Sequence, residues 1–332
     1  MDGEGVERSL TEANYSDKKM SKESLSTIEK RIFFTVSYFN LLEYAPTTFE
    51  IWRHLLGEEK NSLFFVGQSL ERLKTKAELF EKNGFWFLSG KEALIGRRNR
   101  GKKISTEKMK RMAFWVKLLR QLPFLRGVFV RGAVALGLAE RNSDWDVLIV
   151  TKKQRIWLAR FLLMIFLEIF RKRRSGRNER RRTKDRFCLN HFLTEEGLIL
   201  EKQNQFIAHE EGFSFPLMGG VVHKKFLNLN LIWLKKKRAN FVVDGLDPFW
   251  LKKEGQDFPW AKKYTELFLE KTGLADGLNR LLRLWMIRLI KNNPKTFWPK
   301  ADIRYSDQAM IFIPNPWRDG LEKQAEELIS RD

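Results

Sequence analysis

Two short apolar runs, residues 124–130 and 144–150, constrain the fold of this chain most closely. Each is long enough for one buried strand, and residues 133–139 between them have the composition of a short helix. A third strand is predicted at 186–194, after an apolar helix at 156–170. The order strand, helix, strand, helix, strand predicts a mixed sheet with flanking helices, and therefore an α+β protein.

Two carboxylates begin the second of these strands. Asp144 and Asp146 are separated by Trp145, so the alternation of side chains along a strand places both carboxylates on one face and the indole on the other. Two carboxylates side by side suit a divalent cation, and Mg²⁺ typically combines one or two of them with substrate phosphates. The spacing predicts a site for Mg²⁺ or Mn²⁺ at the start of this strand.

A glycine turn precedes the carboxylates. Gly132 and Ala133 follow the first strand and begin the short helix, where glycine lets the backbone approach a ligand and the first helical amides are free to bind phosphate. Ser143 lies directly before Asp144. We expect Gly132, Ala133 and Ser143 to bind the phosphates of a nucleotide beside the metal.

This pattern resembles the DNA polymerase beta superfamily of nucleotidyltransferases. That family has an apolar residue, Gly, then Gly or Ser, a spacer of roughly ten residues, and Asp, apolar, Asp. Here Gly132-Ala133 is followed by ten residues and then by Asp144-Trp145-Asp146. Residues 30–240 also resemble a group of uncharacterised bacterial proteins in which a winged-helix-like region precedes the nucleotidyltransferase domain.

The resemblance implies that Asp144 and Asp146 bind the metal and act in catalysis, and that a nucleoside triphosphate is the substrate. Two positions depart from the family pattern. Ala133 stands where the family usually has Ser, so a hydroxyl contact to phosphate is lost. Asn190 occupies the possible position of the third acid, and an amide cannot accept a proton as a carboxylate does; Asp185, just outside that strand, is an alternative.

The region before this domain, residues 26–95, reads as three helices and a hairpin. Thr47 and Glu50 have the spacing of a capping box, and Asn83-Gly84 is a strong signal for a tight turn. This order predicts a winged helix whose third helix, near 62–76, exposes Gln68, Arg72 and Lys74 to DNA. A packing or dimerisation module remains an equal alternative.

Basic residues dominate two further segments of a chain whose formal net charge is +21. Their composition predicts a basic connecting helix at residues 96–125 and a basic loop at residues 171–184. An excess of this kind favours polyanionic partners such as RNA or DNA, although a solvated loop is an equal alternative for 171–184. The candidate nucleic-acid contacts in this loop are Arg171, Arg173, Arg174, Arg180, Arg181 and Arg182.

The remaining features concern the cellular compartment, the two ends of the sequence and contact with membranes. A single cysteine, Cys188, excludes an intrachain disulfide and favours a cytoplasmic setting. The sequence predicts a disordered leader at residues 1–25 and a mainly helical region at residues 216–332. The apolar helix at 156–170 is interrupted by charges and shorter than the roughly 20 residues that span a bilayer, so no stable membrane insertion is expected. Peripheral membrane association, through the basic loop and an amphipathic helix near residues 281–290, is a further alternative.

These features predict a nucleotidyltransferase-like domain at residues 126–215. Its expected reaction is the metal-dependent transfer of a nucleoside monophosphate from a triphosphate to a hydroxyl group. The alternative is a catalytically silent nucleotidyltransferase fold that acts as a nucleic-acid-binding or regulatory protein.

Overall fold

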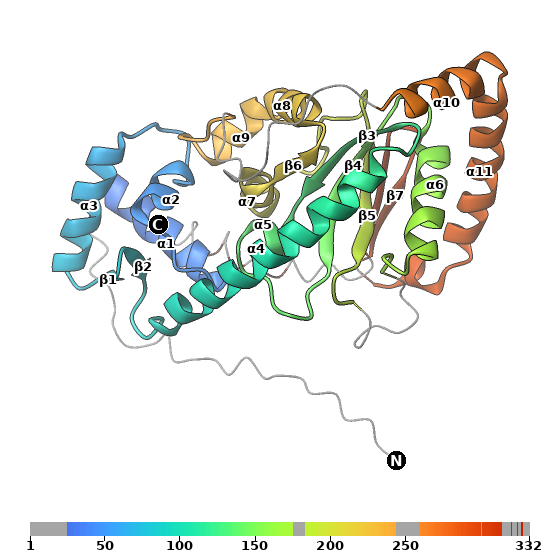
Figure 1. Cartoon of the computed structure of the whole chain (residues 1–332). Coiled ribbons are helices and arrows are strands. Elements are labelled where there is room, and N and C mark those ends of the chain that lie inside the picture. Colours follow the sequence, from blue (N-terminus) through green and yellow to red (C-terminus); the bar gives the residue numbers. More distant parts are fainter. Residues whose placement is uncertain are drawn as a thin grey trace.

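A computed structural model describes residues 25–174, 183–243, 259–299 and 301–313, together with residues 320, 324 and 327. The predicted leader, residues 1–25, lies almost wholly outside this part of the chain. The described residues form a helical unit at one end, a sheet covered by helices in the middle, and a pair of helices at the other end (Figure 1).

The centre of the molecule is a six-stranded sheet with the order β6-β3-β4-β5-β8-β7. Only β4 and β5 are parallel neighbours, and every other pair is antiparallel. The combination of this mixed sheet with helices confirms the α+β class. The strands are β3 (Leu125–Val130), β4 (Trp145–Thr151), β5 (Phe187–Thr194), β6 (Phe215–Met218), β7 (Asp302–Tyr305) and β8 (Ala309–Ile313).

Alternation along β3 and β4 divides the core into two layers. Trp145, Val147 and Ile149 face a cluster formed with α4 (Ala93–Leu119), α6 (Ile156–Ile169) and α11 (Leu274–Lys291). Leu148 and Val150 face the other cluster, with α7 (Gln205–Phe213), α8 (Gly220–Leu229) and α9 (Leu231–Lys237). The face that carries Asp146 is therefore the α7 face of the sheet.

The C-terminal part of the chain corrects the prediction for residues 216–332. It is helical in α8, α9, α10 (Trp260–Lys271), α11 and a short 3₁₀ helix (Pro294–Phe297), but β6, β7 and β8 also come from it and complete the sheet. Both edge strands are short, and β6 contains Pro216. Proline argues against a strand in sequence, yet an edge strand tolerates it.

The N-terminal unit has the predicted order of elements. Its helices are α1 (Thr27–Leu41), α2 (Thr48–Arg53) and α3 (Leu63–Thr75), and its hairpin joins β1 (Phe80–Lys82) to β2 (Phe85–Phe87). Thr47 and Glu50 form the expected capping box, and Asn83 and Gly84 both have positive φ in the turn. A separate apolar cluster holds these elements together.

Buried polar contacts fasten this unit to the sheet. Arg238, after α9, donates to the carbonyl of His54 at 2.7 Å, and Asn240 donates to the carbonyl of Trp52 at 2.8 Å. His54 also stacks on Phe213 of α7, with ring centroids 4.3 Å apart. Among the described residues, no helix has both the length and the apolar character needed to cross a membrane.

Candidate metal and nucleotide site

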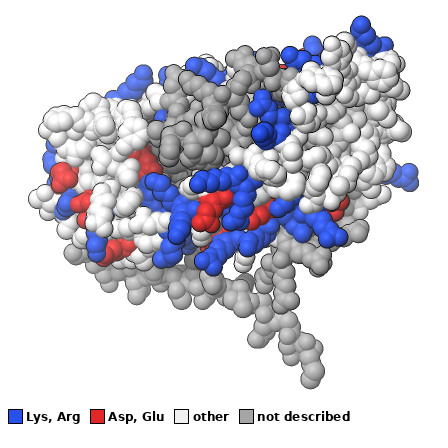
Figure 2. Space-filling model, in the orientation of Figure 1, with Lys and Arg blue, Asp and Glu red and all other residues white. Residues whose placement is uncertain are grey.

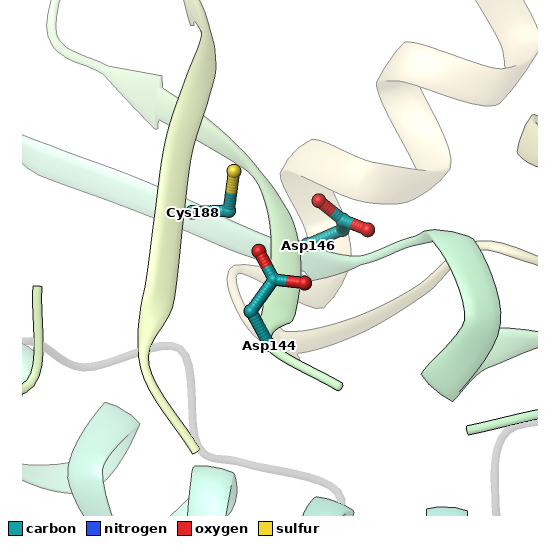
Figure 3. A group of neighbouring side chains, drawn as sticks. All are labelled: Asp144, Asp146 and Cys188. Carbon is teal, nitrogen blue, oxygen red and sulfur yellow. The ribbon is translucent and has the colours of Figure 1, made fainter. Parts of the chain in front are cut away.

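Asp144 and Asp146 lie together at the N-terminal end of β4, next to Cys188 of β5 (Figure 3). One ligand atom from each of the three residues lies within 4.8 Å of the others, and all three residues are half-buried. Trp145 is fully buried on the opposite face. The alternation expected from the sequence thus brings the two carboxylates to one face.

The register of β4 and β5 decides which residue stands beside the pair. The parallel ladder matches Trp145 with Phe187 and Asp146 with Cys188, and a register shift follows before Leu148 meets His191. This corrects the sequence assignment, because the neighbour of Asp146 is Cys188 and not Asn190. Asn190 lies within the shift, where simple alternation no longer predicts its direction.

Gly132 presses against Asp146. Its φ is +62°, and a Cβ at this position would lie 2.6 Å from Oδ2 of Asp146. The backbone also links them, since the amide of Arg131 donates to the carbonyl of Asp146 at 3.0 Å. Glycine is needed here for its positive φ and for the space that the carboxylate fills. Ala133 follows in the first turn of α5 (Gly132–Ala135) and is half-buried.

A buried arginine lies beneath the carboxylates. Arg131, 5% exposed, donates from Nη2 to Glu210 at 2.6 Å and forms an ion pair with Glu211. Its Nη1 donates to Nδ1 of His191 at 2.6 Å. Burial alone would lower the pKa of Arg131, but the carboxylates of Glu210, Glu211 and Asp146 outweigh it and raise the pKa. Arg131 therefore interacts with Glu210, Glu211 and Asp146 together.

A second arginine, Arg174, pairs with Asp144. Its Nη1 donates to Oδ2 of Asp144 at 2.5 Å and contacts Sγ of Cys188 at 3.6 Å. Arg173 forms an ion pair with Glu168, and Arg171 is exposed. The other three arginines proposed as nucleic-acid contacts, Arg180, Arg181 and Arg182, lie outside the described residues.

The loop before Asp144 is held by a buried lysine. Lys108 of α4, 1% exposed, donates to the carbonyls of Arg141 and Ser143 and to Oδ1 of Asp185, at 3.1, 2.8 and 2.8 Å. The hydroxyl of Ser143 accepts from the amide of Glu140 at 2.9 Å, so this side chain closes the turn. The sequence placed Lys108 in the basic connecting helix and carried no signal for this buried role.

Asp185 is committed to α4. Besides Lys108, it accepts from Arg111 at 2.6 Å. Burial alone would raise the pKa of Asp185, but the bonds and charges of Lys108 and Arg111 lower it. Asp185 thus anchors the loop, and it is not part of the group formed by Asp144, Asp146 and Cys188.

The thiol of Cys188 is not equivalent to a third carboxylate. Burial, together with the charges of Asp146 and Asp144, raises the pKa of Cys188 far above its ordinary value. The donor set is two carboxylates beside a sulfur, and a hard divalent cation prefers the carboxylate oxygens.

A pocket of 290 Å³ opens next to these residues on the same face of the sheet. Arg131 and His191 line this pocket, and Leu193, Ile311 and Phe206 supply part of its apolar lining. Its charged residues are of both signs: Glu201, Lys202, Asp302 and Arg304 accompany Arg131. The pocket and the carboxylates thus share Arg131, whose charge acts on Asp146.

Comparisons of the chain with models of protein families, with curated proteins and with solved structures find no match. The functional assignment accordingly rests on the geometry of the site. Three features carry it: the paired carboxylates, the glycine pressed against one of them, and the buried Arg131 network behind them.

Proposed function

We propose that this chain is a nucleotidyltransferase that needs Mg²⁺ or Mn²⁺. The observation that carries the proposal is the contact of Gly132 with Asp146, which places a glycine turn and two carboxylates at one point on the sheet. In the reaction, a hydroxyl oxygen of the acceptor bonds to the α-phosphorus of a nucleoside triphosphate. The bond from that phosphorus to the bridging oxygen breaks, pyrophosphate leaves, and the hydroxyl proton passes to solvent.

Each group of the site has a part in this proposal. Asp144 and Asp146 would hold the cation, whose charge stabilises the triphosphate and the leaving pyrophosphate. The backbone amides of Gly132 and Ala133, at the start of α5, would bind the phosphates. Arg131 holds Asp146 in place through its charge, and its bonds to Glu210 and Glu211 fix its own position.

The site offers no third carboxylate, among the described residues, to accept the proton of the acceptor hydroxyl. In the part of the chain that the structure describes, the group with Asp144 and Asp146 contains the thiol of Cys188 and no third carboxylate. We therefore expect slow transfer, with water as the proton acceptor. The adjacent pocket, with its apolar lining and mixed charges, gives one of the two substrates a place to bind.

The test is a titration of the purified protein with ATP, GTP, CTP and UTP, with and without Mg²⁺. We expect at least one triphosphate to bind only with the metal, and the Asp144→Asn, Asp146→Asn double variant to lose this binding by about 100-fold or more. Glu140→Gln, which removes an exposed carboxylate four residues before Asp144, is the matched control and should bind as the wild type does. Absence of metal-dependent binding to all four triphosphates would refute the proposal.

A second candidate function has its own support. Arg174 places a cation on Asp144 from within the chain, and Cys188 replaces a carboxylate, as in a fold that has lost its reaction. Lys and Arg side chains form a band along α4 (Figure 2); its exposed members include Arg100, Lys102, Lys103 and Lys110. A catalytically silent protein that binds RNA or DNA through this band would show steep salt dependence and no need of metal.

The N-terminal unit would assist such binding if it is a winged helix, as we propose from its order of elements. The side chains predicted to read DNA, Gln68, Arg72 and Lys74, are exposed on α3. Arg72 also bonds to Glu29 and Ser69, and Lys74 to Glu81. These bonds would have to open or be shared in a DNA complex, which favours α4 over α3 as the main basic surface.

A further inference from the structure

Helices α10 and α11 bury only one narrow side. In α10 the buried residues are Lys262 and Glu266, and in α11 they are Ala275, Leu282 and Met286. The two helices contact each other, and α11 packs along α6 at the end of the molecule (Figure 1). Most other residues of both helices are exposed, while Leu269, Ile287 and Ile290 pack partly against the core.

That open side carries large apolar side chains in helical register. They are between 40% and 75% exposed and, apart from the adjacent pair Leu267 and Phe268, follow one another at intervals of three or four residues along each helix. On α10 they are Trp260, Tyr264, Leu267 and Phe268, and on α11 Leu274, Leu278, Leu281, Trp285 and Leu289. We call these nine residues the apolar face. A monomeric soluble protein rarely exposes so many large apolar residues in one place, so a partner is expected to cover them.

Charge on the two helices is sorted by direction. The three acidic residues turn toward the body of the protein, where Glu266 pairs with Arg126 at 2.6 Å, Glu270 with Lys152 at 2.6 Å and Asp276 with Arg155 at 2.7 Å. The exposed cations beside the apolar face are Lys263, Lys271, Arg280, Arg288 and Lys291. Figure 2 shows a broad uncharged stretch at this end of the molecule with Lys and Arg near its margins.

We propose that the apolar face docks on the surface of a membrane that contains anionic lipids. Helices that lie in a membrane interface combine Trp, Phe and Leu on one side with Lys and Arg next to them, and each cation near an anionic leaflet strengthens the attraction. The ring of Tyr264 and the indoles of Trp260 and Trp285 are amphipathic side chains of the kind enriched at the headgroup level.

A second copy of the chain fits this face less well. Pairing two such faces would bring the cations of one copy near those of the other, with the acidic residues of both helices already bound to Arg126, Lys152 and Arg155. Like charges brought together oppose such an association. Anionic headgroups instead supply the opposite charge that these cations match.

The test is sedimentation of the full chain with vesicles of phosphatidylcholine alone and of phosphatidylcholine mixed with phosphatidylglycerol. We expect binding to the mixed vesicles to be about tenfold tighter or more, and to weaken as salt is added. A Tyr264→Ser, Leu281→Ser, Trp285→Ser variant should lose most vesicle binding. A Phe64→Ser, Val221→Ser, Ile232→Ser variant removes equally exposed apolar groups from other elements and should bind as the wild type does.

Charge reversal provides the second variant. Lys271→Glu, Arg280→Glu and Lys291→Glu together should reduce binding to the mixed vesicles roughly tenfold or more while leaving the apolar face intact. Thermal unfolding and metal-dependent nucleotide binding report whether each variant is folded, so a failure of docking is distinguishable from a failure of the proposed function. Two results would overturn the proposal: equal pelleting of wild type and serine variant, or no pelleting together with a concentration-dependent dimer that the serine variant dissociates.

Discussion

At the scale of a single residue, Gly132 connects the glycine turn of the candidate site with its paired carboxylates. Its positive φ and the 2.6 Å that separate an added Cβ from Oδ2 of Asp146 are two separate demands for glycine. The sequence pattern explained this glycine by the approach of a phosphate. The structure adds a second reason, because the carboxylate itself lies against the backbone.

Gly132→Ala should therefore damage both stability and binding. We expect the free energy of unfolding to fall by about 1–3 kcal/mol from backbone strain and crowding, and the affinity for Mn²⁺ to fall because Asp146 must move. Urea unfolding and a metal titration measure the two effects. Gly90→Ala is the control, since Gly90 has φ +74° with open space around it and should lose stability without any loss of metal affinity.

The part of the site that lies on a single strand, β4, could be predicted from the sequence. The period of two along β4 was sufficient to place Asp144 and Asp146 together and Trp145 in the core. The same period could not decide whether Cys188 or Asn190 lies beside Asp146. The two residues are two positions apart on β5, so simple alternation places both on one face, and the register shift before His191 is not visible in the sequence. Lys108 and Arg131 were missed for another reason: a buried charge and a solvated charge look alike until the packing is known.

At the scale of elements, α10 is held against the start of β3 by two polar residues, Lys262 and Glu266. Lys262 donates to the carbonyl of Leu125 at 2.5 Å, and Glu266 accepts from the amide of Phe124 and from Arg126. Burial, and then the charge of Arg126, lowers the pKa of Lys262 to about 7. With its polar side turned inward, α10 leaves its aromatic side on the surface.

This shifted lysine predicts a pH dependence of stability. The unfolded chain holds the proton of Lys262 up to pH 10.5, whereas the folded chain releases it near pH 7, so the free energy of unfolding rises between these values. Lys262→Met has no such proton. We expect it to be more stable than the wild type near pH 6 and to lose on the order of 2–4 kcal/mol of that advantage by pH 10. A constant difference across this range, measured by urea unfolding, would contradict the assignment.

Elements were predictable in proportion to their length and periodicity. The strands β3, β4 and β5 and the helices α1, α3 and α6 follow clear periods of two or about 3.6 residues. The strands β6, β7 and β8 were not predicted, since β6 holds Pro216 in only four residues and β7 and β8 lie in a region predicted to be mainly helical. Their addition moves the end of the sheet region from residue 215 to residue 313.

At the scale of the whole molecule, the site stands between two surfaces of different character. The basic band on α4 lies beside the loop that carries Asp144, because Lys108 of the same helix binds that loop. The apolar face lies on α10 and α11, which cover the far end of the sheet (Figure 1). We infer that substrates and anchoring surface use different parts of the chain.

The central claim is that Asp144 and Asp146 bind a divalent cation, and electron paramagnetic resonance of Mn²⁺ tests it most directly. Free Mn²⁺ gives a sharp signal that binding removes, so a titration counts bound ions without a known substrate. We expect the wild type and Glu140→Gln to bind one ion and the Asp144→Asn, Asp146→Asn variant to release it. Arg174→Ala, which removes the competing cation, should bind the ion more tightly. Identical titrations of the wild type and the double variant would contradict it.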